Sequence, residues 1–319
     1  ISKIKNFSSD QDTHNKILEI GCNDGSFMEN LLIKNYSNIQ GIEPTKDAFK
    51  VCKDKGLNVI NRFFNRALVE ELSMHEKFNT IITRQVLEHI SDLNDFCRAI
   101  NMSLKSNGLL IIEIPDHSMN YELADYSFWE EHINYFTINT LRQLLYKNGF
   151  EIIHYESVLF TGKALIAYCR KLSIEEDINF FDYDLVYRRK YIDTFEVFRE
   201  KMHTFLKVES QKSNEIIVFG AGCRGCNTVN MLKISEYINF FIDDSADKVG
   251  KFCPGSHKAI RSSSNLNSNH LVLLATNSES EEGVIRRFNL SHEKTFSILP
   301  PSPRLPLFWK KHISYLQSI

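Results

Sequence analysis

The sequence of 319 residues has little net charge and no long apolar run. Its formal charge of -2 and its pI of about 6.6 argue against the electropositive surface that nucleic-acid binding requires. No window has the uninterrupted apolar length of a membrane-spanning helix, and the first residues do not form a secretory signal. We therefore expect a cytoplasmic protein that binds neither nucleic acid nor a membrane.

The chain also has few cysteines: there are seven, and they are scattered along the sequence. An odd number in a chain of this length argues against a disulfide framework and for a reducing compartment. Cys223 and Cys226 form a C-x-x-C pair, but the second ligand pair of a zinc site is not evident, so we expect no metal. Because the first residue is Ile and not Met, we expect the natural chain to begin earlier.

The chain is organised around residues 17–27, which read as a short apolar strand, a glycine turn and the start of a helix. Gly21 and Gly25 let the backbone turn sharply and approach a ligand closely, and Asn23 favours the turn. Ligands of open α/β sheets bind at the carboxyl ends of strands, so we expect a small molecule over this loop. Glu43 ends the next strand, about 20 residues later, where a carboxylate can accept ribose hydroxyls.

Strands and helices are predicted to alternate up to residue 170, which indicates βαβ units and a parallel sheet. The predicted strands are residues 16–20, 39–42, 57–60, 78–85, 109–115, 150–158 and 163–170. The predicted helices are residues 27–34, 46–55, 92–104 and 137–148, with Asn107 and Gly108 ending the third. Phe63 and Phe64 follow the third strand, where one of them could stack on an adenine or belong to the core.

A second strand, glycine loop and helix follow a charged, aromatic segment at residues 171–213, which we predict to be one amphipathic linker helix. Residues 215–219 run into a literal G-x-G-x-x-G that begins at Gly220, and Asp243 ends a strand about 20 residues later. A helix N-terminus of this kind suits a phosphate. We therefore predict an α/β protein with two domains, residues 1–170 and 214–319, each Rossmann-like.

Residues 16–170 resemble the class I S-adenosylmethionine (SAM) methyltransferases. The resemblance rests on E-x-G-x-x-x-G in the first loop, on Glu43, on the phrase at residues 84–90, and on an L-K-x-x-G-x-L step at residues 104–110. It implies SAM as the cofactor. The residues that it places at the cofactor are Gly21, Asn23, Gly25, Glu43, Phe63 and Gln85.

The order of the two domains looks like that of the sugar C-methyltransferases of deoxysugar pathways. Residues 218–228 are similar to a phrase of that family, and residues 243–257 match its D-x-x-x-x-K-x-G-x-x-x-P-G-x-H. In that family the C-terminal domain helps to hold a nucleotide-linked sugar. The resemblance carries this role to Gly220, Gly222 and His257.

The chemistry is expected after the fifth strand, where residues 129–136 resemble the family's Tyr-x-Glu-His segment. Glu131 and His132 match its acid/base groups, and His89 matches another active-site histidine of the family. A C-methyltransferase must remove a proton beside a ketone, and a histidine with a pKa near ~6.5 is suited to this. Both histidines could instead be satisfied core residues.

Two departures from that family leave other functions open. Trp129 stands where the family has tyrosine, and an indole N–H cannot accept a proton. The family's N-terminal zinc-binding segment is also missing before Ile17. An O-methyltransferase acting on a sugar or polysaccharide is one alternative, and a nucleotide-dependent oxidoreductase or binding module is another. The sequence names neither the sugar, the nucleotide nor an oligomeric state.

Overall fold

The chain folds into two compact units in the computed structural model, Ile1–Asp116 with Ile133–Asp182, and His117–His132 with Tyr183–Ile319. The expected first domain of residues 1–170 therefore differs from the first unit, since residues 117–132 belong to the second. The structure describes residues 1–7, 15–75, 77–160, 162–172, 184–212 and 215–318.

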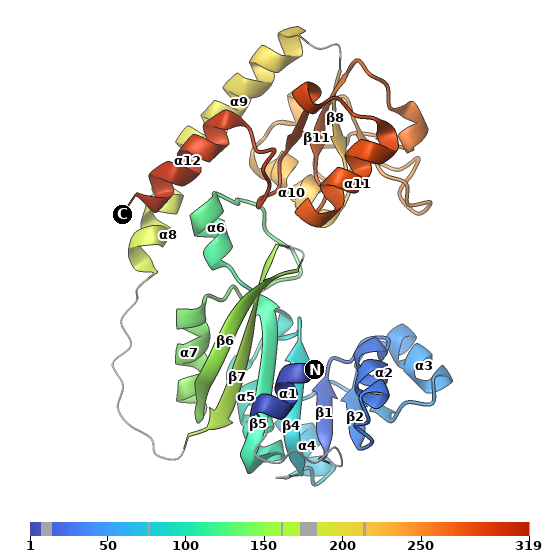
Figure 1. Ribbon diagram of the computed structural model, residues 1–319, viewed down its shortest axis with the longest axis vertical. Coiled ribbons are helices and arrows are strands. Elements are labelled where there is room, and N and C mark those ends of the chain that lie inside the picture. Colours follow the sequence, from blue (N-terminus) through green and yellow to red (C-terminus); the bar gives the residue numbers. More distant parts are fainter. Residues whose placement is uncertain (8–14, 76, 161, 173–183, 213–214, 319) are drawn as a thin grey trace. The chain divides into compact units, whose positions relative to one another are not determined.

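The first unit is built on a seven-stranded sheet with the strand order β3-β2-β1-β4-β5-β7-β6 (Figure 1). Its strands are β1 (Ile17–Ile20), β2 (Ile39–Ile42), β3 (Val59–Ile60), β4 (Phe78–Arg84), β5 (Leu104–Pro115), β6 (Phe150–Leu159) and β7 (Lys163–Lys171). Neighbouring strands are parallel except at β7, which is antiparallel to both β5 and β6. The strand order reverses between β1 and β4, so the carboxyl ends of these two strands mark the expected ligand crevice.

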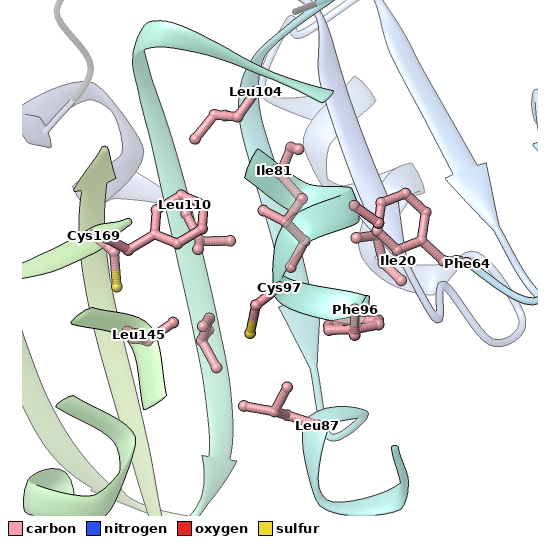
Figure 2. Close-up of a cluster of buried hydrophobic side chains, with 14 of the residues drawn as sticks. Ile20, Phe64, Ile81, Leu87, Phe96, Cys97, Leu104, Leu110, Leu145 and Cys169 are labelled. Atoms are coloured by element: carbon pink, nitrogen blue, oxygen red, sulfur yellow. The ribbon is translucent and has the colours of Figure 1, made fainter. Parts of the chain in front are cut away.

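Helices cover this sheet and enclose the core of the first unit. They are α1 (Ser2–Phe7), α2 (Ser26–Ile33), α3 (Lys46–Asp54), α4 (Arg66–Glu71), α5 (Leu93–Ser103) and α7 (Ile138–Lys147). Figure 2 shows Phe96 and Cys97 of α5 among the side chains of Ile81 and Leu110. These residues are fully or almost fully buried, because each strand sends alternate apolar side chains towards the helices.

The predicted helix at residues 92–104 and the strand after it differ from the structure at their junction. Asp92 caps α5, since its side chain accepts a hydrogen bond from the Asp95 N–H at 2.9 Å. However, α5 ends at Ser103, β5 begins at Leu104, and Gly108 lies inside the strand. The pairing register of β4 and β5 shifts between Phe78 and Thr80, so this irregularity admits the extra residues of β5.

The second unit contains a parallel five-stranded sheet with the order β10-β9-β8-β11-β12. Its strands are β8 (Glu215–Phe219), β9 (Phe240–Ile242), β10 (Ile260–Arg261), β11 (His270–Leu274) and β12 (Thr295–Ser297). Its helices are α6 (Ser118–Leu123), α8 (Leu185–Asp193), α9 (Phe195–Lys212), α10 (Cys223–Met231), α11 (Ser278–Phe288) and α12 (Leu307–Gln317). The architecture is the second Rossmann-like α/β unit that the sequence predicts.

The predicted linker helix at residues 171–213 is two helices, α8 and α9, in its described part. Residues 173–183 and 213 lie outside the described residues. The two helices meet at Thr194, and α9 lies beside α12 (Figure 1). The ring of Phe198 is buried and meets that of Trp309 edge-on at 4.8 Å. The rings of Tyr191 and Phe198 thus pack in the core of the second unit, whereas Tyr187 of α8 is exposed.

Residues 117–132 join the second unit through contacts that their sequence does not reveal. The Trp309 indole N–H donates a hydrogen bond to the carbonyl oxygen of Leu123 at 3.0 Å. The buried rings of Tyr126 and Tyr191 stack with their centroids 4.3 Å apart.

Among the residues described, none of the helices has the length and apolar character needed to cross a bilayer.

Candidate functional site

The first glycine turn is shaped mainly by packing within the protein. Gly21 and Gly25 have φ angles of 71° and 76°, which favour glycine. A Cβ atom at Gly21 would lie 2.4 Å from Cγ2 of Val86, and one at Gly25 would lie 2.2 Å from Cδ1 of Leu57. Both glycines are therefore needed for the turn itself, whether or not a ligand lies over it.

Glu43 connects this turn to the next helix. Its Oε2 accepts a hydrogen bond from the Asn23 N–H at 2.9 Å, and its Oε1 accepts two from the Thr45 N–H and hydroxyl at 2.8 and 2.6 Å. A carboxylate offers about four acceptor sites, so one remains for a ligand hydroxyl. Glu43, which is predicted to bind the ribose, therefore also holds the loop in place.

A cluster of charged side chains at the ends of β1, β4 and β5 was not predicted from the sequence. It consists of Glu19, Arg84 and Glu113, and the Arg84 Nε lies 3.2 Å from Oε2 of Glu113. Glu19 is only 2% exposed, and its Oε2 has no hydrogen-bond partner in the described part of the chain. Burial raises the pKa of Glu19 to about 8, and the nearby Arg84 opposes the shift. The available signal was a single carboxylate inside an otherwise apolar strand.

Gln85 and Phe63 also lie at the carboxyl ends of strands in the first unit. Gln85 has a φ of 53°, and its N–H donates a hydrogen bond to the Glu113 carbonyl oxygen at 2.8 Å. Phe63 is 74% exposed, whereas Phe64 is buried and meets the ring of Phe96 edge-on. Phe64 is thus the core residue of the aromatic pair, and Phe63 is the one that could stack on a ligand.

His89 ends a short 3-10 turn, Leu87–His89, that follows β4. Its side chain is exposed, so the alternative that His89 is a core residue is wrong. The neighbouring Glu88 is buried, and this burial raises the pKa of its carboxyl to about 7. The Glu88 carbonyl oxygen accepts hydrogen bonds from the N–H groups of Ile133 and Asn134, each at 3.0 Å.

Glu131 and His132 belong to the second unit. His132 is half-buried, and its ring stacks on the indole of Trp129 with a centroid distance of 5.4 Å and an angle of 13°. The ring of His117 meets His132 edge-on at 6.5 Å. Glu131 is exposed. The indole of Trp129 therefore covers one face of the imidazole.

The second glycine loop has one open glycine. A Cβ atom at Gly220 would lie 2.7 Å from the Ala275 carbonyl oxygen, and one at Gly225 would lie 2.7 Å from the Ala275 Cβ. At Gly222 a Cβ atom would meet nothing within 4 Å. Gly222 directly precedes α10, so the open space lies at the N-terminus of a helix.

The acid that follows this loop is bound by the protein itself. Oδ2 of Asp243 accepts hydrogen bonds from the Ala221 N–H at 3.0 Å and from Nζ of Lys248 at 2.9 Å. Burial acts to raise the pKa of Asp243, but the hydrogen bonds from Ser245, Lys248 and Ala221 outweigh it and lower the pKa. The carboxylate therefore fixes the loop, as Glu43 does in the first unit.

His257 lies in a loop that packs on α10. Its φ is 54°, its side chain is exposed, and its N–H donates a hydrogen bond to the Cys253 carbonyl oxygen at 3.0 Å. Nδ2 of Asn230 in α10 donates to the Pro254 carbonyl oxygen at 3.0 Å. Gly222 thus lies at the N-terminus of α10, and the loop that carries His257 contacts the same helix at Asn230.

Comparisons with known protein families match two stretches of the chain, whose bounds differ from those of the two units. Residues 1–155 match a family described as a methyltransferase domain, and residues 163–287 match one described as a C-methyltransferase C-terminal domain. The curated relatives include ubiquinone biosynthesis O-methyltransferases. That of Pelagibacter ubique is 30% identical over 130 residues, which are 39% of this chain and 52% of the relative. That of Bradyrhizobium diazoefficiens is 29% identical over 100 residues, or 30% and 38% of the two chains. The chain spans about half, or less, of the length of these relatives.

Solved SAM-dependent methyltransferases are also similar to part of the chain. The structure from Archaeoglobus fulgidus is 19% identical, with a TM-score of 0.41, and the match covers 52% of this chain and 90% of that one. The structure from Methanosarcina mazei is 19% identical, with a TM-score of 0.43, and the match covers 54% and 98%. The sheet order and the family match agree that residues 1–155 belong to a methyltransferase domain with the class I fold, and its cofactor is SAM.

Glu19 allows a test of the charged cluster through the free energy of unfolding. In the unfolded chain its carboxyl ionises near ~4.3, whereas the folded state keeps the proton up to a pH of about 8. The wild type therefore loses stability as the pH rises through this window, and the loss is complete above it. We expect Glu19→Gln to melt at the same temperature as the wild type near pH 4 and at a higher one at pH 8. Equal melting temperatures at both pH values would contradict the buried, protonated carboxyl.

Proposed function

We propose that this protein transfers the methyl group of SAM to a carbon atom of a nucleotide-linked keto-sugar. The match of residues 163–287 to a C-methyltransferase C-terminal domain carries this proposal. The open glycine at the N-terminus of α10 supports a phosphate-bearing substrate. The seven free thiols support the cytoplasm as its location.

The residues of the first unit fit SAM in three respects. Glu43 has one acceptor site left for a ribose hydroxyl, and the exposed ring of Phe63 can stack on the adenine. The buried Oε2 of Glu19 can pair with the cationic amino group. Gly21, Gly25, Asn23 and Gln85 complete the proposed set by shaping the backbone around these side chains. When bound, SAM supplies a methyl group activated by a sulfonium, and the protein contributes mainly by positioning it.

The affinity for SAM should depend on pH through Glu19. A cationic ligand favours the ionised carboxylate, so binding must release the proton that Glu19 holds below a pH of about 8. Titration calorimetry should show the affinity rising by up to about tenfold per pH unit below this value and levelling off above it. Glu19→Gln should bind SAM more weakly and without this dependence. A wild-type affinity that is flat between pH 6 and 8 would exclude the contact.

The proposed base is His132. An imidazole has its ordinary pKa near ~6.5 and can accept a proton from a carbon beside a ketone at neutral pH. The C–H bond breaks, its electron pair forms the enolate, and the proton moves to a ring nitrogen. The stacked indole of Trp129 fixes the plane of the ring. Glu131 orients His132 or accepts the proton itself, and His89 is a further proposed acid/base group.

O-methyl transfer is the second candidate function, because the curated relatives that match part of the chain are named O-methyltransferases. Such a transfer requires one base or positioning alone, and no enolate forms. The replacement of the family's tyrosine by Trp129 is compatible with this simpler chemistry. The two candidates differ in whether the enzyme exchanges a carbon-bound proton with solvent.

We predict that the enzyme exchanges the proton beside the ketone of its substrate with deuterium from solvent in the absence of SAM. The exchange should fall at least about 100-fold in His132→Ala, since general-base catalysis contributes this much, while the affinity for SAM is kept. His292→Ala, which removes an exposed histidine of the second unit, is the matched control. Mass spectrometry of the recovered sugar measures the exchange. Methyl transfer without any exchange would favour the O-methyltransferase.

Gly222 allows a test of the proposed nucleotide site without a change in the fold. A methyl group at this position fits the open space but obstructs a phosphate, so Gly222→Ala should lower the affinity for uridine or thymidine diphosphate by about tenfold. Gly283→Ala is the control, because a Cβ atom there also meets nothing within 4 Å. Calorimetry measures both. An unchanged affinity in Gly222→Ala would place the nucleotide elsewhere. The same change at Gly220 would clash with Ala275 and test only folding.

A further inference from the structure

The first turns of α10 hold the segment that carries Glu131 and His132. The thiol of Cys223 donates a hydrogen bond to Oε2 of Glu130 at 2.7 Å. Nδ2 of Asn227, one helical turn later, donates to the same oxygen at 3.1 Å and also to the carbonyl oxygen of Phe128. These hydrogen bonds, first that from Cys223, lower the pKa of Glu130 and keep it ionised. Two side chains of one helix face thus fix the residues on both sides of Trp129.

A buried ion pair fixes the beginning of the same segment. The guanidinium of Arg224 lies 2.8 Å from Oδ2 of Asp125, and it also donates to the Pro300 carbonyl oxygen at 3.0 Å. The side chains of Arg224 and Asp125 are only 8% and 4% exposed. The carbonyl oxygen of Asp125 accepts further hydrogen bonds from Asn120 at 2.8 Å and from the Tyr191 hydroxyl at 2.7 Å. The segment therefore cannot shift at Asp125 without breaking several interactions.

The fixed residues connect to the proposed base through Trp129. The Trp129 carbonyl oxygen accepts a hydrogen bond from the His132 N–H at 3.1 Å, and the two rings stack. Phe128 and Glu130, which Asn227 holds, are the chain neighbours of Trp129. Asn227 is thus connected to the indole through the chain neighbours of Trp129, and the indole contacts the imidazole.

We propose that Asn227 and Arg224 are positioning residues for the acid/base segment, which they hold at the glycine loop that we assign to the nucleotide-linked sugar. The inference rests on the proposed function where it gives this segment an acid/base role. The contacts that hold the segment do not depend on the proposed function. Arg224 and Cys223 are variable positions of the G-x-G-x-x-G motif, and both point to residues 117–132. Gly222 is left open for the ligand. One helix thereby sets the place of both the substrate's phosphate and the base.

The test compares three single variants. Asn227→Ala removes the amide that donates to Glu130 and to Phe128, and α10 does not weaken because alanine is the better helix former. Asn227→Asp keeps the size of the side chain but replaces the donating amide by a carboxylate that repels Glu130. Asn265→Ala is the matched control, since Nδ2 of this exposed residue donates to the Ser262 carbonyl oxygen in the same unit.

The readout is the ¹⁹F spectrum of protein labelled with 5-fluorotryptophan, which has two resonances because the chain has two tryptophans. The resonance of Trp129, identified with Trp129→Phe, reports the stack on His132. The resonance of Trp309, which is buried in the second unit, reports the fold. We expect both Asn227 variants to move the Trp129 resonance towards that of the free amino acid and to leave the Trp309 resonance in place. Asn265→Ala should change neither.

The kinetic expectation is a fall of kcat by about tenfold in both Asn227 variants, with an unchanged affinity for SAM. If the Trp129 resonance moves but turnover does not depend on His132, the positioning stands and the proposed function fails. An unchanged Trp129 resonance in both Asn227 variants would overturn the inference. If both resonances move, the Asn227 variants have disturbed the fold, and Glu130→Ala is used instead because it removes the exposed carboxylate that accepts the hydrogen bonds. An unchanged Trp129 resonance in Glu130→Ala would likewise overturn the inference.

Discussion

The buried ion pair between Asp125 and Arg224 is the interaction on which the arrangement of the second unit depends. Removal of one partner from a pair of this kind leaves an unpaired buried charge, which typically costs about 3–5 kcal/mol. The pair attaches residues 117–132 to α10, although these residues follow β5 of the methyltransferase sheet in the chain. Asp125 is also linked to Tyr191 of α8, so the ion pair connects two helices with the inserted segment. The proposed base therefore belongs to the second unit and not to the unit that contains the seven-stranded sheet.

The two glycine loops share one construction principle but differ in what their glycines do. In each unit the acid at the end of the following strand accepts a hydrogen bond from a backbone N–H of the loop, Glu43 from Asn23 and Asp243 from Ala221. These carboxylates hold the loops in shape before any ligand binds. Gly21, Gly25 and Gly220 are required by contacts within the protein, whereas Gly222 faces open space. Both loops therefore combine a glycine turn with an acid on the following strand. The glycines of the first loop are needed for packing, whereas the second loop leaves open space at a helix N-terminus.

Local patterns predicted the strands and both glycine loops well, because apolar runs and glycine turns are properties of neighbouring residues. The strand β2 and the strand β8 begin and end where the sequence indicates. The prediction was wrong for the helix end near Gly108, since the register of β4 against β5 decides it. The transfer of residues 117–132 to the second unit and the partners of Arg224 depend on contacts between distant residues, which no local pattern contains. Glu19 is the acid of the predicted E-x-G-x-x-x-G motif, but its burial beside Arg84 was not predicted, although a carboxylate in a short apolar strand is unusual.

The central claim is that the methyl group of SAM is transferred to a carbon atom of a nucleotide-linked keto-sugar. Incubation of the purified protein with a panel of nucleotide-linked sugars and ¹³C-methyl-labelled SAM tests it most directly. Mass spectrometry identifies the labelled product, and the carbon chemical shift tells a methyl group on carbon from one on oxygen. The account predicts label on a carbon of a keto-sugar that still carries its nucleotide. Label on oxygen, or label only on acceptors without a nucleotide, would contradict it.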